Sequence, residues 1–300
     1  MLATILRLIL YAGFTLFLVG FWRSDDTPLA AVLTVASWLS AMFSLALLVE
    51  FFIVAAVNRR DSVPRAGLGS MMRAFVGEAV AVLPVFLWWQ PFRHARMRDT
   101  SGTTEPLLRG VILLHGFLCN RGIWTLWMRD LQREGRPFIA LNLEPVFGSI
   151  DAYAPQVEEA IARMTLLTGQ VPVLICHSMG GLAARAWLRS AGAGAAARVS
   201  RIVTIGSPHH GTWLGRFSPV LNGRQMRLSG QWIRRLPADP GSAEANCFIC
   251  WFSNCDNIVF PASTATLPGA DNRLVIGMGH VQMALSPRIR HETLALVRSL

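Results

Sequence analysis

The feature that most constrains this chain is a pair of long apolar runs near its amino terminus. Residues 2–22 carry a charge only at Arg7, and residues 29–57 carry a charge only at Glu50. A helix needs about 20 predominantly apolar residues to cross the hydrocarbon core of a bilayer, so both runs are long enough. Because no clear small-residue cleavage site separates them, we predict two transmembrane helices rather than a cleaved signal peptide.

A third apolar stretch, residues 74–92, is interrupted by Glu78 and Pro84. The uncharged part that remains, residues 79–92, has a length more typical of interfacial or buried helices. Basic residues flank the stretch on both sides, which favours a helix lying in the interface over one that crosses the bilayer. We therefore predict that residues 1–100 form a membrane anchor of two transmembrane helices plus a third spanning or interfacial helix.

The charges around the two apolar runs predict their orientation. The linker between the runs carries Arg23, Asp25 and Asp26, whereas the segment after the second run carries four arginines, namely Arg59, Arg60, Arg65 and Arg73. By the positive-inside rule, that later segment lies in the cytoplasm and the chain is a multi-pass protein of the inner cell membrane. The remainder is then cytoplasmic if the third stretch stays in the interface, and on the opposite side if it crosses.

Composition agrees with a membrane part followed by a globular part. Of the 300 residues, 52% are hydrophobic and only 15% charged, and the apolar excess lies in the first hundred. The net charge of +10 comes from arginines that cluster beside the apolar segments rather than in one basic stripe. This favours an anionic membrane surface over nucleic acid as a partner. The odd count of five cysteines predicts a mostly reduced set.

From residue 110 onward, short apolar runs alternate with segments of helical period. Strands are predicted at 111–114, 138–143, 171–176, 202–205, 247–252 and 274–276, and helices at 123–134, 155–167, 179–190 and 288–299. Strands that alternate with helices in this way are typical of a mostly parallel sheet with helices on its faces. We therefore predict an α/β domain of about six strands over residues 101–300.

The decisive local feature is the sequence Cys-His-Ser-Met-Gly-Gly at residues 176–181, between an apolar run and a helical stretch rich in Ala and Leu. A sharp strand-to-helix turn there exposes the Oγ atom of Ser178 as a nucleophile, and it needs small residues because the flanking chains approach closely. Gly180 provides one small position, and Cys176 stands where a second glycine is usual. Without other support, a serine at such a turn is more often a helix cap.

Two later residues fit the roles of acid and base. Asp256 follows the predicted strand 247–252 directly, and His280 follows the last predicted strand, which is the chain order expected after a nucleophile elbow. In this mechanism His280 takes the proton of Ser178 and returns it to the leaving alcohol, while Asp256 orients the imidazole. Each residue alone is more simply explained as a turn aspartate or a histidine with a structural role.

Backbone N–H groups near the elbow are candidates for an oxyanion hole. The tripeptide His115-Gly116-Phe117 ends the first strand, so the backbones of Phe117 and Met179 are the predicted donors. Rival triad residues are close in sequence to important strands, namely His177, His209, His210 and Asp271. His177 adjoins the nucleophile and Asp271 precedes its strand, so neither suits the role.

These motifs resemble the bacterial lipase-like branch of the α/β-hydrolase superfamily, which includes triacylglycerol lipases and their esterase relatives. The resemblance covers about residues 108–300 and rests on residues 114–117, 177–181 and 206–212 together with the contexts of Asp256 and His280. It implies an α/β-hydrolase fold and a serine hydrolase that cleaves carboxylic esters, in particular acyl lipids, through an acyl-enzyme and without a cofactor. It also implies that the loop 206–212 shapes the acyl pocket.

The residues predicted to line the substrate site are His115, Gly116, His177, Pro208 and His209. The departures are Cys176 and the absence of the leading antiparallel strands.

Two further segments invite an interpretation. Residues 212–243 interleave apolar side chains with arginines, which predicts either a lid that opens at a lipid surface or a long connection packed on the sheet. Cys247, Cys250 and Cys255 suggest a zinc site. The first two are three apart on a predicted strand and would point to opposite faces, so we predict no metal.

Other functions remain to be weighed against ester hydrolysis. A thioesterase or acyltransferase would use the same triad and acyl-enzyme, and the sequence does not separate these activities. A non-catalytic membrane scaffold would have no need for an intact Ser178, Asp256 and His280. A transport component would use acids within its apolar helices, but Glu50 and Glu78 are interpreted as helix-end or interfacial carboxylates.

Overall fold

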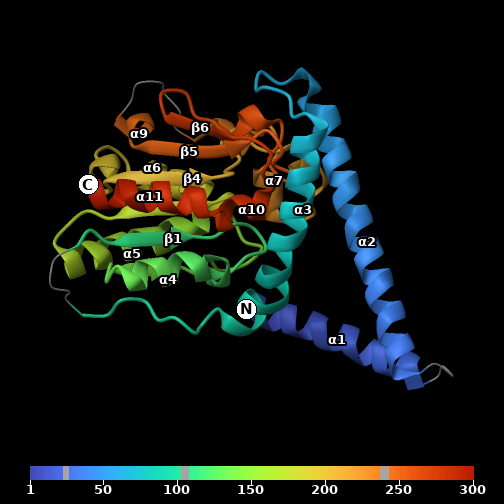
Figure 1. Cartoon of the computed structure of the whole chain (residues 1–300). Coiled ribbons are helices and arrows are strands. Elements are labelled where there is room, and N and C mark those ends of the chain that lie inside the picture. Colours follow the sequence, from blue (N-terminus) through green and yellow to red (C-terminus); the bar gives the residue numbers. More distant parts are fainter. Residues whose placement is uncertain (23–26, 103–107, 237–242) are drawn as a thin grey trace.

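A sheet of six parallel strands forms the body of the protein, in the order β2-β1-β3-β4-β5-β6 (Figure 1). The computed structural model describes residues 1–22, 27–102, 108–236 and 243–300. The strands are Val111–Leu114 (β1), Phe138–Ala140 (β2), Val173–His177 (β3), Arg201–Ile205 (β4), Phe248–Ser253 (β5) and Asp271–Val275 (β6). The predicted fold class is confirmed. The second strand ends three residues earlier than expected, and the last one begins three residues earlier.

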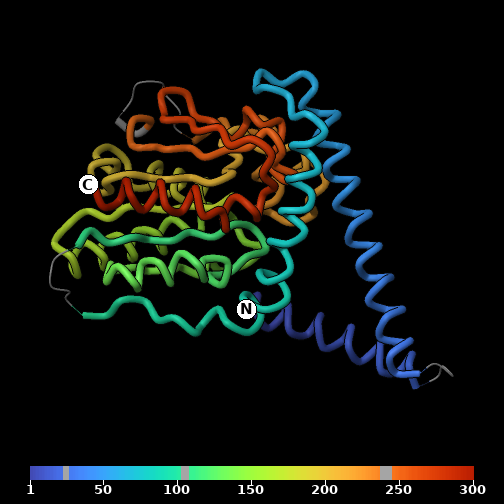
Figure 2. Tube along the Cα trace, viewed as in Figure 1, coloured from blue at the N-terminus to red at the C-terminus, as the bar shows by residue number. Residues whose placement is uncertain are grey.

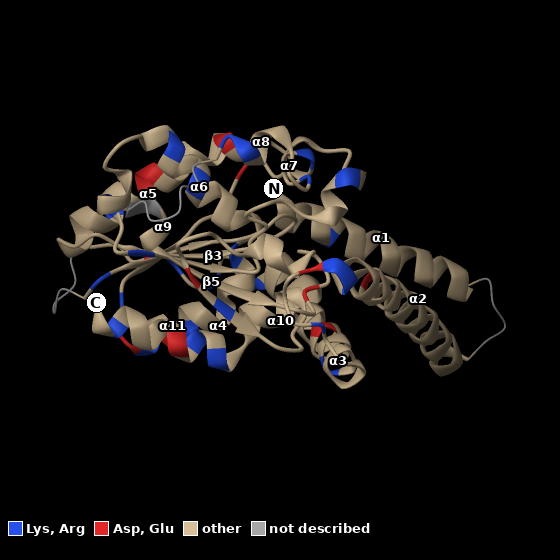
Figure 3. Ribbon diagram, turned by 90° about the horizontal axis from the view of Figure 1, so that it is seen from above, with Lys and Arg blue, Asp and Glu red and all other residues tan. Residues whose placement is uncertain are grey.

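Helices cover both faces of this sheet (Figure 3). On one face lie Ala154–Thr168 (α5) and Met179–Ala191 (α6), and on the other lie Thr125–Arg133 (α4) and Pro287–Ser299 (α11). Strand β3 shows why both faces are apolar: Leu174 and Cys176 pack toward α5 and α6, whereas Val173 and Ile175 pack toward α4 and α11. Successive side chains of a strand point to opposite faces, so a strand buried on both sides must be apolar throughout.

In its described residues, the predicted cap segment forms short helices. A one-turn helix, Trp213–Phe217 (η6), is followed by Leu221–Gln225 (α7) and Gln231–Arg234 (α8), and Ala243–Asn246 (α9) leads into β5. Residues 237–242 of this segment lie outside the described residues. Met226, Ile233 and Leu236 are buried in the same cluster as α5 and α6, so this part of the segment packs on the body.

The amino-terminal third forms three long helices. They are Leu2–Trp22 (α1), Pro28–Val57 (α2) and Leu68–Pro84 (α3), and α3 continues as the π-helical segment Val85–Arg93 (η2). By length and apolar composition, all three are candidates to cross a membrane. Helices α1 and α2 extend away from the body, and α3 lies against it (Figures 1 and 2). Large apolar side chains on α1 and α2 are exposed, such as Leu16 at 73% and Phe52 at 75%, as lipid contact requires. The charged linker 23–26 lies outside the described residues.

The third helix differs from its prediction. It starts at Leu68 and continues through both predicted interruptions, so its full length is compatible with a membrane-spanning helix. Pro84, which lacks an N–H and disturbs helical hydrogen bonding, marks the change from α-helix to π-helix. Glu78 is only 1% exposed in the middle of α3, so it is not a helix-end carboxylate. Glu50 likewise lies within α2 and is hydrogen-bonded to Asn257.

The cysteine geometry also needs a correction. Cys247 precedes β5, so the alternation of side chains along a strand does not apply to it. It packs in the same cluster as Cys250 rather than on the opposite face. Within the described ranges, no group of three or more His, Cys, Asp or Glu side chains is arranged to hold a metal ion.

Gly122 tests how closely η2 packs on the body. A Cβ atom at this position would lie 2.8 Å from backbone atoms of Trp89 and Gln90 in η2. We expect Gly122→Ala to lower the free energy of unfolding by about 1–3 kcal/mol through overpacking. The measurement is thermal unfolding of the detergent-solubilised full chain. The control is Gly69→Ala on α3, where a Cβ atom meets nothing within 4 Å. Equal unfolding temperatures for both variants would contradict this packing.

Candidate active site

Ser178 occupies a strained turn between β3 and α6. Its backbone has φ 55° and ψ −126°, a conformation that is costly for any residue except glycine. The N–H of Ser178 donates to the carbonyl oxygen of Ile205 at 2.9 Å, which ties the turn to the end of β4. A sharp turn of this kind between strand and helix has the geometry of a nucleophile elbow.

The end of β1 lies directly against this turn. A Cβ atom on Gly180 would be 2.3 Å from the carbonyl oxygen of Leu114, and one on Gly116 would be 2.7 Å from Cβ of Ser178. Both glycines are therefore required by close approach of the chains. A side chain fits at position 176, because Cys176 is buried in the apolar cluster under α5 and α6.

The two predicted oxyanion donors belong to segments that meet at Ser178. Phe117 follows Gly116 in the loop after β1, and Met179 is the first residue of α6. Phe117 is partly buried, and its ring meets that of Phe147 edge-on at 6.3 Å. Both backbones therefore lie next to the serine turn.

Asp256 and His280 come together at the carboxyl ends of β5 and β6. Nδ1 of His280 lies 3.0 Å from Oδ1 and 2.9 Å from Oδ2 of Asp256, and both side chains are buried. Oδ1 of Asp256 also accepts from the N–H groups of Ile258 at 2.9 Å and Val259 at 2.8 Å. With its Nδ1–H donated to the carboxylate, a neutral imidazole keeps Nε2 as a proton acceptor.

The charges around His280 set its affinity for a proton. Burial alone lowers the pKa of His280, but the charge and hydrogen bond of Asp256 and the charges of Glu78 and Glu50 outweigh this effect. The net pKa of His280 is therefore raised above its ordinary value. The surroundings favour the imidazolium, which is the form that a general base reaches during proton transfer.

His177 contacts the loop that carries His280. Its Nε2 lies 3.3 Å from the carbonyl oxygen of His280, and the two rings are 4.6 Å apart. Burial and the neighbouring His280 hold the pKa of His177 well below its ordinary value, so the ring is neutral and its Nε2–H donates. The residue before the serine is thereby linked to the loop that carries His280.

His115 has a similar structural role. Its Nε2 accepts from the N–H of Leu143 at 2.9 Å, so its Nδ1–H donates to the carbonyl oxygen of Gly116 at 2.9 Å. Burial lowers the pKa of His115 to about 4. The neutral ring fastens the end of β1 to the segment after β2.

The loop after β4 supports the acid and base. Gly206 has φ 57°, and a Cβ atom there would be 2.9 Å from Oδ2 of Asp256 and 3.1 Å from Nδ1 of His280. Pro208 is buried, and His209 is fully buried with its Nε2 3.0 Å from Oγ1 of Thr204. The contact of His209 with Thr204 therefore lies in the protein interior.

The rival Asp271 lies elsewhere. It is the first residue of β6, at the amino end of a strand whose carboxyl end leads to His280, and it pairs with Arg273 at 2.6 Å.

Sequence reasoning gave no role in the site to Asn257, Glu50, Glu78 and Gln90. Asn257 accepts the N–H of His280 through Oδ1 at 3.0 Å, and its Nδ2 donates to Oε2 of Glu50 at 2.7 Å. Glu78 contacts the backbone just after His280, and Gln90 contacts the loop after β1. The only signal in the sequence was the presence of acids inside apolar helices, which is rare enough to suggest a function.

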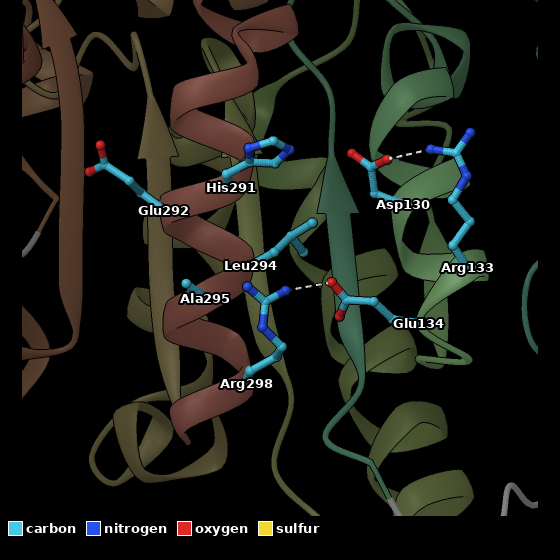
Figure 4. A pocket seen from close by; sticks show the side chains of 8 residues that line it. All are labelled: Asp130, Arg133, Glu134, His291, Glu292, Leu294, Ala295 and Arg298. Carbon is cyan, nitrogen blue, oxygen red and sulfur yellow. Dashed lines mark hydrogen bonds and ion pairs between the residues drawn. The ribbon is translucent and has the colours of Figure 1, made fainter.

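A separate cavity of about 620 Å³ lies between α4 and α11 (Figure 4). Several of its charged residues are paired with one another, as Arg298 is with Glu134 at 2.6 Å and Arg133 is with Asp130 at 3.4 Å. Neither Ser178 nor His280 lines this cavity, so it does not serve the site.

Known proteins share this architecture. Residues 111–284 match the model of the alpha/beta hydrolase family. The mature form of a Bacillus licheniformis lipase has a similar fold, with a TM-score of 0.57, 14% identity and coverage of 67% of this chain and 96% of that one. Aspergillus fumigatus lipase B has a TM-score of 0.59, 17% identity and coverage of 67% and 55%, respectively. No curated protein sequence matches the chain. At these identities, the likeness concerns the fold.

The charge of Asp256 is testable through His280. Because that charge raises the pKa of His280, we expect Asp256→Asn to lower the pKa of His280. The measurement is an NMR titration of histidine-labelled protein in detergent micelles, with the His280 signal assigned by His280→Gln. Asp271→Asn, which removes an exposed carboxylate, should leave the titration unchanged. An unshifted His280 signal in Asp256→Asn would contradict this electrostatic role.

Proposed function

Because the chain belongs to the alpha/beta hydrolase family, we propose that it is a serine hydrolase that cleaves carboxylic esters, in particular acyl lipids. One observation carries the proposal. The strained Ser178 turn is linked through His177 to the loop of His280, whose Nδ1 is held by the buried Asp256. A serine, a histidine with a free Nε2 and a buried carboxylate are the groups that a charge-assisted nucleophile requires.

The proposed reaction follows from this arrangement. Nε2 of His280 takes the proton of Ser178 while Oγ attacks the ester carbonyl, and Asp256 stabilises the imidazolium that forms. The N–H groups of Phe117 and Met179 donate to the oxyanion, and each such donor contributes about 3 kcal/mol to the transition state. His280 then protonates the leaving alcohol. Water, activated by the same histidine, hydrolyses the acyl-enzyme and restores Ser178.

The lipid part of the proposal rests on the surface beside the site. Three apolar helices are available to hold the protein at a membrane, and the cap segment exposes Phe217 at 66% and Leu221 at 44%. The guanidinium of Arg216 lies 4.4 Å from the centre of the Trp213 ring, which places a cation next to these apolar side chains. We propose that residues 212–225 act as a lid toward lipid while the buried residues after them act as a packed connection.

The proposed organisation is a membrane anchor over residues 1–100 and a catalytic domain over residues 101–300, with its cap at 212–243. Residues 103–107 lie outside the described ranges. We propose a multi-pass protein of the inner membrane, with the catalytic domain in the cytoplasm when two helices cross the bilayer and on the opposite side when all three cross.

Ser178→Ala tests the nucleophile. We expect fluorophosphonate labelling to disappear and the turnover of p-nitrophenyl esters to fall at least about 10³-fold, because the acyl-enzyme no longer forms. Ser190→Ala, at an exposed position of the same helix α6, is the matched control and should behave as wild type. A series of ester chain lengths ranks the acyl preference.

The same preparation separates the neighbouring activities. Faster turnover of acyl thioesters than of oxygen esters would indicate a thioesterase, and acyl transfer to an added alcohol in place of hydrolysis would indicate an acyltransferase. Folded wild-type protein that is not labelled at all would overturn the serine hydrolase proposal in favour of a scaffold.

A further inference from the structure

Glu78 of α3 is bonded to the segment that begins with His280. Its Oε1 accepts the N–H of Val281 at 2.9 Å, and its Oε2 accepts the N–H of Gln282 at 2.8 Å. These residues belong to the short helix His280–Leu285 (α10), whose first N–H groups have no partner within the helix. A carboxylate at that end accepts hydrogen bonds from these N–H groups and interacts favourably with the helix dipole.

The contact between α3 and α10 is tight. A Cβ atom on Gly279 would be 2.5 Å from Oε2 of Glu78, and one on Gly77 would be 2.1 Å from Nε2 of Gln282. The side chain of Gln282 in turn accepts the N–H of Gly279 through Oε1 at 2.9 Å. Glycine at both positions lets the helix and the loop approach, so the geometry of the His280 loop depends on α3.

The same continuous helix also contacts the loop that follows β1. Gln90, fully buried in η2, accepts the N–H of Asn120 through Oε1 at 2.6 Å, and its carbonyl oxygen accepts from Nδ2 of Asn120 at 2.9 Å. Asn120 ends the loop that begins with Gly116 and Phe117 beside Ser178. One helix therefore bonds to the loop of the base and to the loop of a proposed oxyanion donor.

Burial of a carboxylate and an amide in an apolar helix is costly unless hydrogen bonds compensate it. A helix that served only to anchor the chain would pack through apolar residues, as Ala81 and Val85 do against the body. Helix α2 adds a polar contact of the same kind, since Glu50 bonds to Asn257, which in turn bonds to the N–H of His280.

We propose that Glu78 and Gln90 are positioning residues, through which the helix Leu68–Arg93 holds the His280 loop and the loop after β1 in their catalytic arrangement. This inference rests on the proposed function. It extends the catalytic unit into the amino-terminal helices, beyond the segment 101–300.

The first test uses Glu78→Gln in the full chain in detergent micelles. Fluorophosphonate titration gives the concentration of active sites, so kcat is expressed per labelled site. We expect kcat to fall roughly 10- to 100-fold with KM unchanged, because a misplaced base slows proton transfer without weakening substrate binding.

The pH profile distinguishes positioning of His280 from a general loss of structure. The groups that face His280 are Asp256, Glu78 and Glu50 as carboxylates and His177 as a neighbouring ring. Removal of the Glu78 charge lowers the pKa of His280, so the acid limb of kcat/KM should move to lower pH.

Gln90→Ala provides an independent test. It removes the acceptor of the Asn120 N–H but no charge, so kcat per site should fall while the acid limb stays in place. Two control variants should match wild type: Val80→Ala at a 65% exposed position of α3, and Glu159→Gln at an exposed position of α5.

The outcomes separate clearly. A reduced labelled fraction with normal kcat per site in both variants would show a purely structural role and overturn the proposal. Wild-type behaviour of both variants would also overturn it. If Glu78→Gln yields too little folded protein, kcat per site of Gln90→Ala decides. Wild type that neither labels nor turns over esters would instead overturn the proposed function, and the positioning role with it.

Discussion

The site depends on negative charge held out of water around one imidazole. Asp256, Glu78 and Glu50 all raise the proton affinity of His280, and buried carboxylates are stable only when their oxygens are satisfied. Asp256 is satisfied by two backbone N–H groups besides the imidazole, Glu78 by two others, and Glu50 by the amide of Asn257. These contacts bring together the carboxyl ends of β5 and β6, the start of α10 and two apolar helices. The fold around the carboxyl edge of the sheet follows from that requirement.

The amino-terminal helices and the α/β body share their packing. Ala81 and Val85 of the third helix belong to the same apolar cluster as the residues of α4 and α11, and Leu47 and Ala74 pack around Cys255, the neighbour of Asp256. A boundary near residue 100 divides the sequence by composition, but the apolar core crosses it. This packing buries polar contacts such as that of Glu78.

The sequence predicted those features that are encoded locally. Alternation of apolar runs located all six strands, and the small residues around Ser178 located the turn between β3 and α6, because strand period and close approach act over a few residues. The contact of Glu78 with Val281 joins residues 203 positions apart, and no local pattern reports it. The histidines show the same limit. His115 and His177 were predicted from motifs, and a motif does not reveal the hydrogen-bond partners of a side chain, which for both are backbone groups.

The polar residues that the third helix contributes match the charges that the proposed reaction would create. Glu78 lies on the side of His280, where an imidazolium forms and a carboxylate lowers its energy. Gln90 lies on the side of the loop after β1, where the negative oxyanion forms and a carboxylate would raise its energy. A neutral amide can accept the Asn120 N–H without adding negative charge. Hydrogen bonding alone would allow either residue at either position. The electrostatics of the proposed transition state give a reason for an acid at position 78 and an amide at position 90.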